Sequence, residues 1–227
     1  MTREIHTTKM GPKNERPSYQ KDKLQLMIQI RNRGIQNLNI EQALHRFPRE
    51  WFVSEKQKPD AYNDNPLPIG SGQTISQPYI VALMTDLLDL TGSEKVLEIG
   101  TGCGYQTAIL GSLCKEVHSI EIVKSLYKST VKRFENFAKF DSVVMSQVFL
   151  YLKDGKLGVS EAAPFDRILC AAESSEIPPE WTKQLKVGGK IVMPLNNDLV
   201  VLTKTKESLD LPYTKKVIIP VRFVPLV

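Results

Sequence analysis

The sequence predicts an α/β protein with a doubly wound, mostly parallel seven-stranded sheet and a small helical portion at its N-terminal end. Two observations predict this class. From residue 76 onward, short apolar runs alternate with helical patterns, and this alternation is typical of parallel sheets. With 227 residues, of which 41% are apolar and 24% charged, the chain can bury one core of this kind.

The first residues predict a tail and then a helix. Residues 1–20 are polar, basic and non-periodic, which predicts a flexible tail. A helical pattern follows in residues 22–34, and Gly34 is its expected stop. The apolar positions that share one predicted helical face are Leu24, Met27, Ile28 and the stem of Arg31.

A second short helix and a connector complete the N-terminal portion. The run "NIEQALHRFP" predicts a helix that begins after Asn39 as N-cap and ends at Pro48. Residues 54–68 are rich in Pro, Asp and Asn, which predicts a loop between this helical portion and the sheet.

The sheet and its helices are then predicted in order. The expected helices are 77–90, 105–114, 123–138 and 178–186. The expected strands are 95–99, 116–120, 142–148, 165–171, 189–194, 199–204 and 216–224. The last of these contains Pro220, so we expect it at the edge of the sheet.

Composition narrows the function classes. The net charge of +5 is mild and much of the excess lies in the first 23 residues, so nucleic-acid binding is not favoured. The three cysteines are far apart and form no zinc-type motif, so no metal is expected. With no secretion signal and no apolar run of membrane-spanning length, we expect a cytoplasmic protein.

The stretch "VLEIGTGCGYQTAIL" predicts a strand, a glycine loop and the start of a helix. Gly100, Gly102 and Gly104 allow a sharp turn and close approach of a ligand to backbone N–H groups. The spacing is not that of a dinucleotide site, because Tyr105 stands where its last glycine would be. A nicotinamide-dependent dehydrogenase is therefore not favoured.

Glu121 ends the second strand, 21 residues beyond Gly100. A carboxylate at this position can accept hydrogen bonds from both hydroxyls of a ribose. The alternative is a solvated glutamate at a strand end. The combination of Glu121 with the glycine loop favours a nucleoside-binding site over this alternative.

Glu98, the glycine loop and Glu121 together resemble the class I S-adenosylmethionine-dependent methyltransferases. The resemblance implies the Rossmann-like sheet of that class and S-adenosylmethionine as cofactor. It implies cofactor contacts from Glu98, Gly100, Thr101, Gly102, Gly104, Glu121, Asp154 and Gly155. From the sequence alone, Asp154-Gly155 is also simply a good turn.

The stretch "IGSGQTISQPYIVA" predicts a second loop with glycines and small polar residues, some thirty residues before the glycine loop. With "APFDRILCAA", "EIPPEWTKQLKVGGKIVMPL" and "VRFVPLV" it resembles the protein-L-isoaspartate O-methyltransferase family, from about residue 22 to the C-terminus. The resemblance implies methylation of the stray carboxylate of an isoaspartyl residue in a damaged protein. The ester then collapses to a succinimide, which reopens partly to aspartate.

The resemblance also assigns the acceptor side of the site. Ser76 is expected to orient the carboxylate with its hydroxyl, while Thr74 and the backbone around Ile75 shape the pocket and Val224 contacts the peptide. The carboxylate is ionised at pH 7, so no general base is required. The competing interpretation is that Ser76 merely N-caps the helix that begins at Pro78.

Three positions depart from the family pattern. Cys103 replaces a more usual serine, Lys153 a glycine, and Val159 a tryptophan. We expect lower cofactor affinity at most. The alternatives left open are a methyltransferase of a small molecule or RNA, and a cofactor-binding protein that has lost catalysis.

These inferences divide the chain into three parts: a basic tail (1–20), a helical portion with the substrate-site loop (21–75), and a methyltransferase domain with a C-terminal β segment (76–227). The expected partners are damaged proteins or peptides with isoaspartyl residues. We expect a monomer that binds neither nucleic acid nor a membrane.

Overall fold

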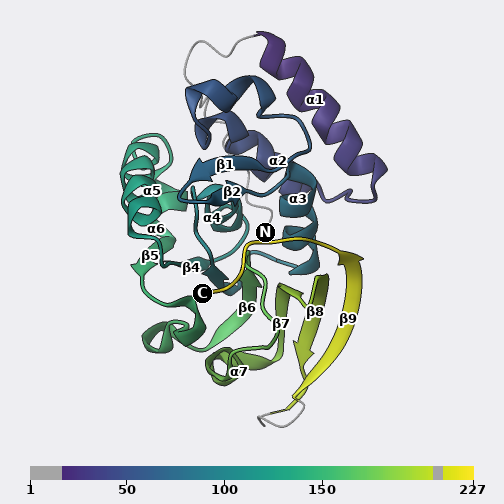
Figure 1. Ribbon diagram of the computed structural model, residues 1–227, viewed down its shortest axis with the longest axis vertical. Helices are drawn as coiled ribbons and strands as arrows, with labels where there is room; N and C mark the ends of the chain where they lie inside the picture. Colours follow the sequence, from purple (N-terminus) through teal and green to yellow (C-terminus); the bar gives the residue numbers. More distant parts are fainter. Residues whose placement is uncertain (1–16, 207–211) are drawn as a thin grey trace, which may run out of the picture.

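The chain folds around one seven-stranded sheet, as the sequence predicts (Figure 1). The computed structural model describes residues 17–206 and 212–227. The strand order is β5-β4-β3-β6-β7-β8-β9. All pairs from β5 to β7 are parallel, and β8 is antiparallel to both β7 and β9. The sheet is therefore mostly parallel with an antiparallel edge.

The elements are bounded as follows. The strands of the sheet are β3 (Lys95–Ile99), β4 (Glu116–Glu121), β5 (Val148–Leu152), β6 (Phe165–Cys170), β7 (Leu185–Leu195), β8 (Asp198–Lys204) and β9 (Tyr213–Pro220). A separate hairpin is made by β1 (Leu67–Gly70) and β2 (Gln73–Ile75). The α-helices are α1 (Pro17–Asn32), α2 (Leu38–Arg46), α3 (Pro78–Leu87), α4 (Tyr105–Gly111), α5 (Lys124–Phe137), α6 (Ser142–Ser146) and α7 (Pro179–Gln184). The 3₁₀ turns are η1 (Arg49–Trp51), η2 (Glu55–Asp60), η3 (Gly155–Leu157) and η4 (Ser160–Ala162).

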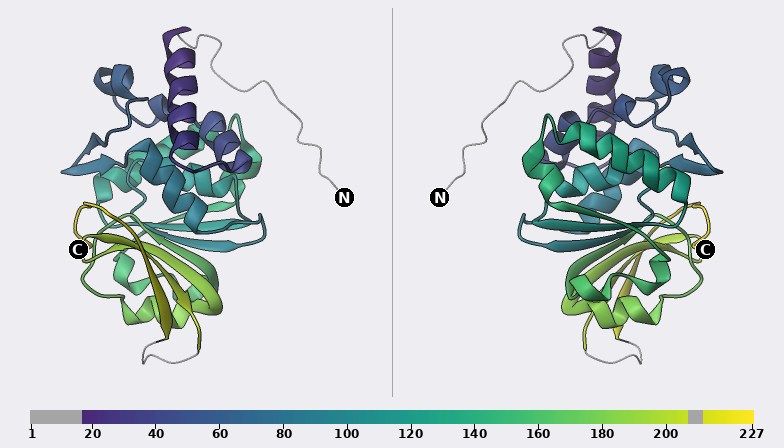
Figure 2. Two further views of the ribbon diagram at one scale, coloured as in Figure 1. Left: turned by 90° about the vertical axis from the view of Figure 1, so that its right-hand side faces the viewer. Right: turned by 90° about the vertical axis from the view of Figure 1, so that its left-hand side faces the viewer.

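The two faces of the sheet are covered differently. In Figure 2 the larger helices lie above the sheet, and α7 lies below it with the 3₁₀ turns η3 and η4. Alternate residues of each strand enter alternate clusters, so Val96 packs with the N-terminal helices and Leu97 packs with Trp181. The central strand β3 is buried on both faces, as its apolar run predicts.

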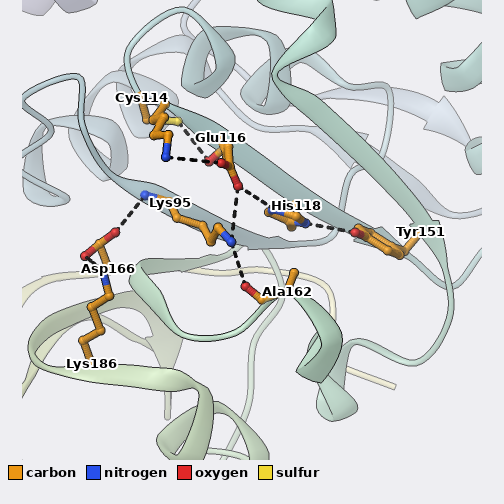
Figure 3. A network of polar contacts seen from close by, with 9 residues as sticks. Lys95, Cys114, Glu116, His118, Tyr151, Ala162, Asp166 and Lys186 are labelled. Atoms are coloured by element: carbon orange, nitrogen blue, oxygen red, sulfur yellow. Dashed lines mark hydrogen bonds and ion pairs between the residues drawn. The ribbon is translucent and has the colours of Figure 1, made fainter.

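A polar network fixes the amino ends of the central strands (Figure 3). The Lys95 amide N–H donates to Asp166 at 2.9 Å, and its ammonium group donates to the Ala162 carbonyl at 3.0 Å. The same ammonium lies 3.3 Å from the carboxylate of Glu116. These contacts tie β3, β4 and β6 together at one end of the sheet and leave their carboxyl ends free for a site.

The predicted face of helix α1 is wrong by about one position. Leu24 is 60% exposed, whereas Met27 is 5% exposed. The buried residues of the helix are Tyr19, Lys23, Leu26, Met27 and Ile30. The apolar residues of this helix are compatible with burial of either of two adjacent faces. The buried face is the one that carries Tyr19, whose ring packs on Tyr62. The helix also begins at Pro17, inside the predicted tail, whose residues 1–16 lie outside the described residues.

Two further predictions are corrected. Asn37, not Asn39, is the N-cap of α2, and its side chain accepts from the N–H groups of Asn39 and Ile40. The predicted strand 142–148 is the short helix α6, and the strand itself comes later, in β5. Its Val-Val pair favours a strand, but Asp141 caps a helical turn by accepting from the Val144 N–H at 3.3 Å.

Other elements are confirmed with shifted ends. Strand β7 begins four residues earlier than predicted, and β9 ends at Pro220 rather than 224. The predicted connector 54–68 contains the turn η2 and the start of the β1 strand. β9 is the last strand of the sheet, as expected for a strand with a proline. None of the helices in residues 17–206 and 212–227 is both long and apolar enough to cross a membrane.

The corrected face of α1 generates a matched pair of stability predictions. We expect Met27→Ala to lower the free energy of unfolding by about 2–4 kcal/mol, because it leaves a cavity in the core. Leu24→Ala, on the exposed face of the same helix, should change it by about 0.5 kcal/mol or less. Urea unfolding of both variants and the wild type checks this, and equal losses would contradict the assigned face.

Candidate active site

A cavity of about 630 Å³ lies at the carboxyl ends of β3, β4 and β6, where doubly wound sheets usually bind ligands. Its wall includes the glycine loop, the β1–β2 hairpin, the start of α3 and the C-terminal residues after β9. The predicted site residues among its lining are Thr74, Ser76, Gly100, Gly102, Glu121, Gly155 and Val224. The structure thus joins both predicted loops in one cavity.

The glycine loop has a backbone that only glycine adopts easily. The φ angles of Gly100, Gly102 and Gly104 are 94°, 55° and 85°. Gly104 is the N-cap of α4, and a Cβ atom there would lie 2.7 Å from side-chain atoms of Phe134 and Thr130. Gly104 therefore allows α5 to pack against the loop, whereas Gly100 and Gly102 face the cavity.

Glu121 lies at the end of β4 and is 5% exposed. One carboxylate oxygen accepts from the Gly102 N–H at 2.7 Å, and the other accepts from the Val123 N–H at 2.8 Å. The alternative of a solvated glutamate is therefore wrong. A carboxylate oxygen can accept more than one hydrogen bond, and Glu121 lines the cavity, which suits a pair of vicinal hydroxyls.

Glu98 lies beneath the glycine loop and does not line the cavity. It is fully buried, and one oxygen accepts from the hydroxyls of Thr107 at 2.5 Å and Ser119 at 2.6 Å. Its other oxygen has no partner among the described residues. Burial, aided by the nearby charge of Glu121, raises the pKa of Glu98 to about 7.

Two other predicted cofactor residues, Thr101 and Asp154, are not among the residues that line the cavity. The Thr101 hydroxyl is 2.6 Å from that of Ser119 and is buried with it. Asp154 caps the turn η3 by accepting from the Lys156 N–H at 2.8 Å. The next residue, Gly155, does line the cavity, and a Cβ atom there would lie 2.5 Å from Ile99. The Asp-Gly pair is thus a turn that places a glycine at the cavity.

Ser76 follows the hairpin and lines the cavity, but it does not cap helix α3. The N-cap position is Gln77, which makes no side-chain cap bond. The Tyr79 N–H at the start of the helix instead donates to Asp64 at 2.8 Å. Within the described residues the Ser76 hydroxyl has no hydrogen-bond partner, so it is available to a ligand. The neighbouring side chain of Ile75 is 4% exposed and packs in the core.

A buried arginine holds the backbone of this loop. Arg49 is 1% exposed and donates to the carbonyls of Ala61 at 2.8 Å, Asn65 at 3.0 Å and Ser76 at 3.0 Å. Burial lowers the pKa of its guanidinium. The connector and the loop that carries Ser76 are therefore fixed by one side chain, which the sequence analysis missed.

The C-terminal segment forms another wall and crosses back over the sheet in Figure 1. The Glu173 N–H donates to the Val224 carbonyl at 2.7 Å, and the Leu226 N–H donates to the Glu173 carbonyl at 2.7 Å. These bonds hold Val224 at the cavity. The departures from the family pattern lie elsewhere, because Cys103, Lys153 and Val159 do not line the cavity.

Besides Arg49, which lies outside the lining, the sequence analysis missed several residues that do line the cavity. Arg33 comes from the turn after α1, and its ion-pair partner Asp64 comes from the connector. Apolar side chains at the strand ends and in the C-terminal segment complete the wall. They include Ile99, Ile120, Ile122, Ile219 and Phe223. Position at the carboxyl end of a strand could have indicated the first three. The described residues contain no cluster of three or more His, Cys, Asp or Glu side chains that could hold a metal ion.

Comparison with known proteins points to one family. A sequence model of the protein-L-isoaspartate(D-aspartate) O-methyltransferase (PCMT) family matches residues 20–227. The protein-L-isoaspartate O-methyltransferase of Syntrophus aciditrophicus is 47% identical over 197 residues, which cover 85% of this chain and 88% of that protein. The enzyme of the same name from Parvibaculum lavamentivorans is 40% identical over 215 residues, or 92% of each chain.

Solved structures are similar in fold. A structure named protein-L-isoaspartate O-methyltransferase has a TM-score of 0.77 at 25% identity; the match covers 89% of this chain and 65% of that one, which is therefore longer. A second, from Plasmodium falciparum in complex with S-adenosyl-L-homocysteine, has a TM-score of 0.73 at 22% identity and covers 89% and 97%. The predicted Rossmann-like methyltransferase sheet is thereby confirmed.

The buried carboxyl of Glu98 generates a pH prediction. Its folded pKa is raised, so the folded state holds more protons than the unfolded state between about pH 4.5 and 7, and stability falls as the pH rises through this range. Glu98→Gln keeps an oxygen for Thr107 and Ser119 and lacks the titration. As the pH rises from 4.5 to 8, the free energy of unfolding of the variant should increase by on the order of 3 kcal/mol relative to that of the wild type.

The measurement is urea unfolding of both proteins at several pH values across this range. The difference between the two curves cancels the titration of other groups. Parallel stability curves for the variant and the wild type would show that Glu98 does not titrate as assigned.

Proposed function

The chain belongs to the protein-L-isoaspartate(D-aspartate) O-methyltransferase family, and we propose that its cavity transfers the methyl group of S-adenosylmethionine to the free carboxylate of L-isoaspartyl residues in damaged proteins. The methyl ester then leads to a succinimide and to partial return to aspartate. The observation that carries the proposal is that the glycine loop with Glu121 and the loop with Ser76 line one cavity.

The cofactor half of the cavity fits a nucleoside. Gly100 and Gly102 present bare backbone to the cavity, and Glu121 offers two oxygens to the ribose hydroxyls. Gly155 and the apolar residues Ile99 and Ile120 also line the cavity and offer an apolar surface to an adenine ring. We assign Glu98, Thr101, Gly104 and Asp154 to the support of this surface, since their side chains or packing contacts lie behind it.

The acceptor half positions a carboxylate. When bound, S-adenosylmethionine supplies an electrophilic methyl group, and the carboxylate is already ionised at pH 7, so the protein needs no general base. Ser76 donates its hydroxyl hydrogen to one carboxylate oxygen and leaves the other oxygen to attack. Orientation of this kind can contribute on the order of 7–11 kcal/mol to lowering a barrier.

The peptide on either side of the isoaspartyl residue is proposed to lie along Thr74, the backbone at Ile75, and Val224. The C-terminal segment uses the N–H of Leu226 and the carbonyl of Val224 for its own anchoring. Pro225, the one residue between them, has no N–H, so its carbonyl is the group that we propose to accept a hydrogen bond from an extended peptide. Backbone pairing would make the enzyme tolerant of many flanking sequences.

The remaining expectations are proposals of the same kind. We propose that the protein acts as a monomer. The three cysteines are buried and unpaired, which fits a cytoplasmic protein. A substrate among small molecules or RNA is not favoured, because the family and the curated relatives named above are protein methyltransferases.

The experiment that tests the proposal uses two synthetic peptides that differ only in an isoaspartyl or a normal aspartyl linkage at one position. Labelled methyl from S-adenosylmethionine should appear only in the isoaspartyl peptide, as a base-labile ester. Equal labelling of both peptides, or labelling of neither with the cofactor bound, would overturn the proposed substrate.

The role of Ser76 is tested in the same assay. We expect Ser76→Ala to lower kcat by about 10- to 100-fold, because loss of one positioned donor costs this order or more. Its free energy of unfolding should stay within about 0.5 kcal/mol of wild type, since the hydroxyl caps no helix. Ser71→Ala, in the exposed turn of the hairpin and outside the cavity lining, is the matched control with unchanged kcat. Full activity of Ser76→Ala would contradict the assigned role.

A further inference from the structure

Charged side chains in the cavity lining are few. They are Arg33, Glu121 and Arg222. Glu121 is committed to backbone N–H groups and to the proposed ribose site. The two arginines have no part in the mechanism proposed above, although each brings a permanent positive charge to the cavity.

Arg33 is held in place on the acceptor side of the cavity. Its guanidinium lies 3.2 Å from the ring centre of Tyr79, and one of its nitrogens is 2.7 Å from a carboxylate oxygen of Asp64. Asp64 also accepts from the Tyr79 N–H at the start of α3. Tyr79 follows Ser76 by three residues, so the arginine is fixed to the element that carries the proposed carboxylate holder.

This arrangement leaves donors of Arg33 unused. Only one terminal nitrogen is engaged by Asp64, and the side chain is 46% exposed. A guanidinium has five N–H groups in a planar fork that matches a carboxylate. Because the stack and the ion pair already order the side chain, binding a second anion loses little further conformational entropy. Arg222, in contrast, has no ion-pair partner among the described residues.

The anion that Arg33 binds is better understood as a neighbouring group of the substrate than as the reacting carboxylate itself. Two hydrogen bonds from an arginine would withdraw charge from the attacking oxygen and make it a poorer nucleophile. An acidic side chain of the peptide has no such constraint. Its contact would add to binding without changing the chemical step.

We propose that Arg33, positioned by Asp64 and Tyr79, is a specificity-determining residue that binds an acidic side chain flanking the isoaspartyl residue. The inference rests on the proposed function and refines its substrate class to damaged sites in acidic sequence. The contact is partly exposed, so it is worth a few-fold in kcat/KM and weakens with salt.

The experiment compares three isoaspartyl peptides that carry Glu, Gln or Lys at the two positions on each side of the damaged residue. Wild type should use the Glu peptide about fivefold better than the Lys peptide in kcat/KM, and 0.5 M salt should remove most of this ratio. Arg33→Gln should lose the ratio through a higher KM for the Glu peptide, with kcat unchanged.

Two variants separate charge from structure. Arg31→Gln removes the same charge from the last turn of α1, just before Arg33, but Arg31 pairs with Glu41 outside the cavity, so the ratio should stay. Arg33→Lys keeps the charge and should keep most of the preference. Thermal unfolding of each variant checks that all are folded.

Three outcomes would overturn the proposal. These are an unchanged ratio in Arg33→Gln, an equal loss for all three peptides, and a loss of the ratio in Arg31→Gln. An equal loss would instead place Arg33 on the reacting carboxylate or in the support of the loop. If wild type labels no isoaspartyl peptide at all, the proposed function itself fails, and this result is distinct from the other three.

Discussion

A guanidinium with no ion pair among the described residues lies at the base of the acceptor loop. The terminal nitrogens of Arg49 donate hydrogen bonds to backbone carbonyls of two segments. Ala61 and Asn65 belong to the connector, and Ser76 belongs to the loop after the hairpin. Burying this charge is costly, and only several well-placed acceptors offset the cost. The Nε of Arg49 has no partner among the described residues, but its two terminal nitrogens join the connector to the loop and so fix where Ser76 lies.

The cavity joins two surfaces of different origin. The carboxyl ends of β3 and β4 provide the glycine loop and Glu121, a surface that depends on backbone conformation more than on side chains. The N-terminal portion provides the hairpin and the ordered charge of Arg33. A reaction between an ionised carboxylate and a sulfonium methyl needs alignment rather than acid or base chemistry. A rigid wall made from distant segments suits that requirement.

Much of the fold and of the candidate site could be predicted from the sequence, because some of their features depend only on short stretches of it. The glycine spacing and Glu121 at a strand end predict the cofactor half of the cavity, and strand–helix alternation predicts the sheet. The strand expected at 142–148 failed because Asp141 caps a helical turn there, against the preference of its valines. The sequence did not indicate the roles of Arg33 and Arg49, because each depends on partners far along the chain and an arginine ordinarily lies in solvent.

The account is tested most directly by amide hydrogen exchange of Arg49→Lys beside wild type. Lysine keeps the charge but cannot reach carbonyls in two segments with a planar fork. We predict that amides in residues 61–77 lose protection, that those in β3 keep it, and that methyl transfer to an isoaspartyl peptide falls while binding of S-adenosylhomocysteine persists. Wild-type protection of residues 61–77, or equal loss of protection in β3, would contradict the claim that this one side chain shapes the acceptor half of the site.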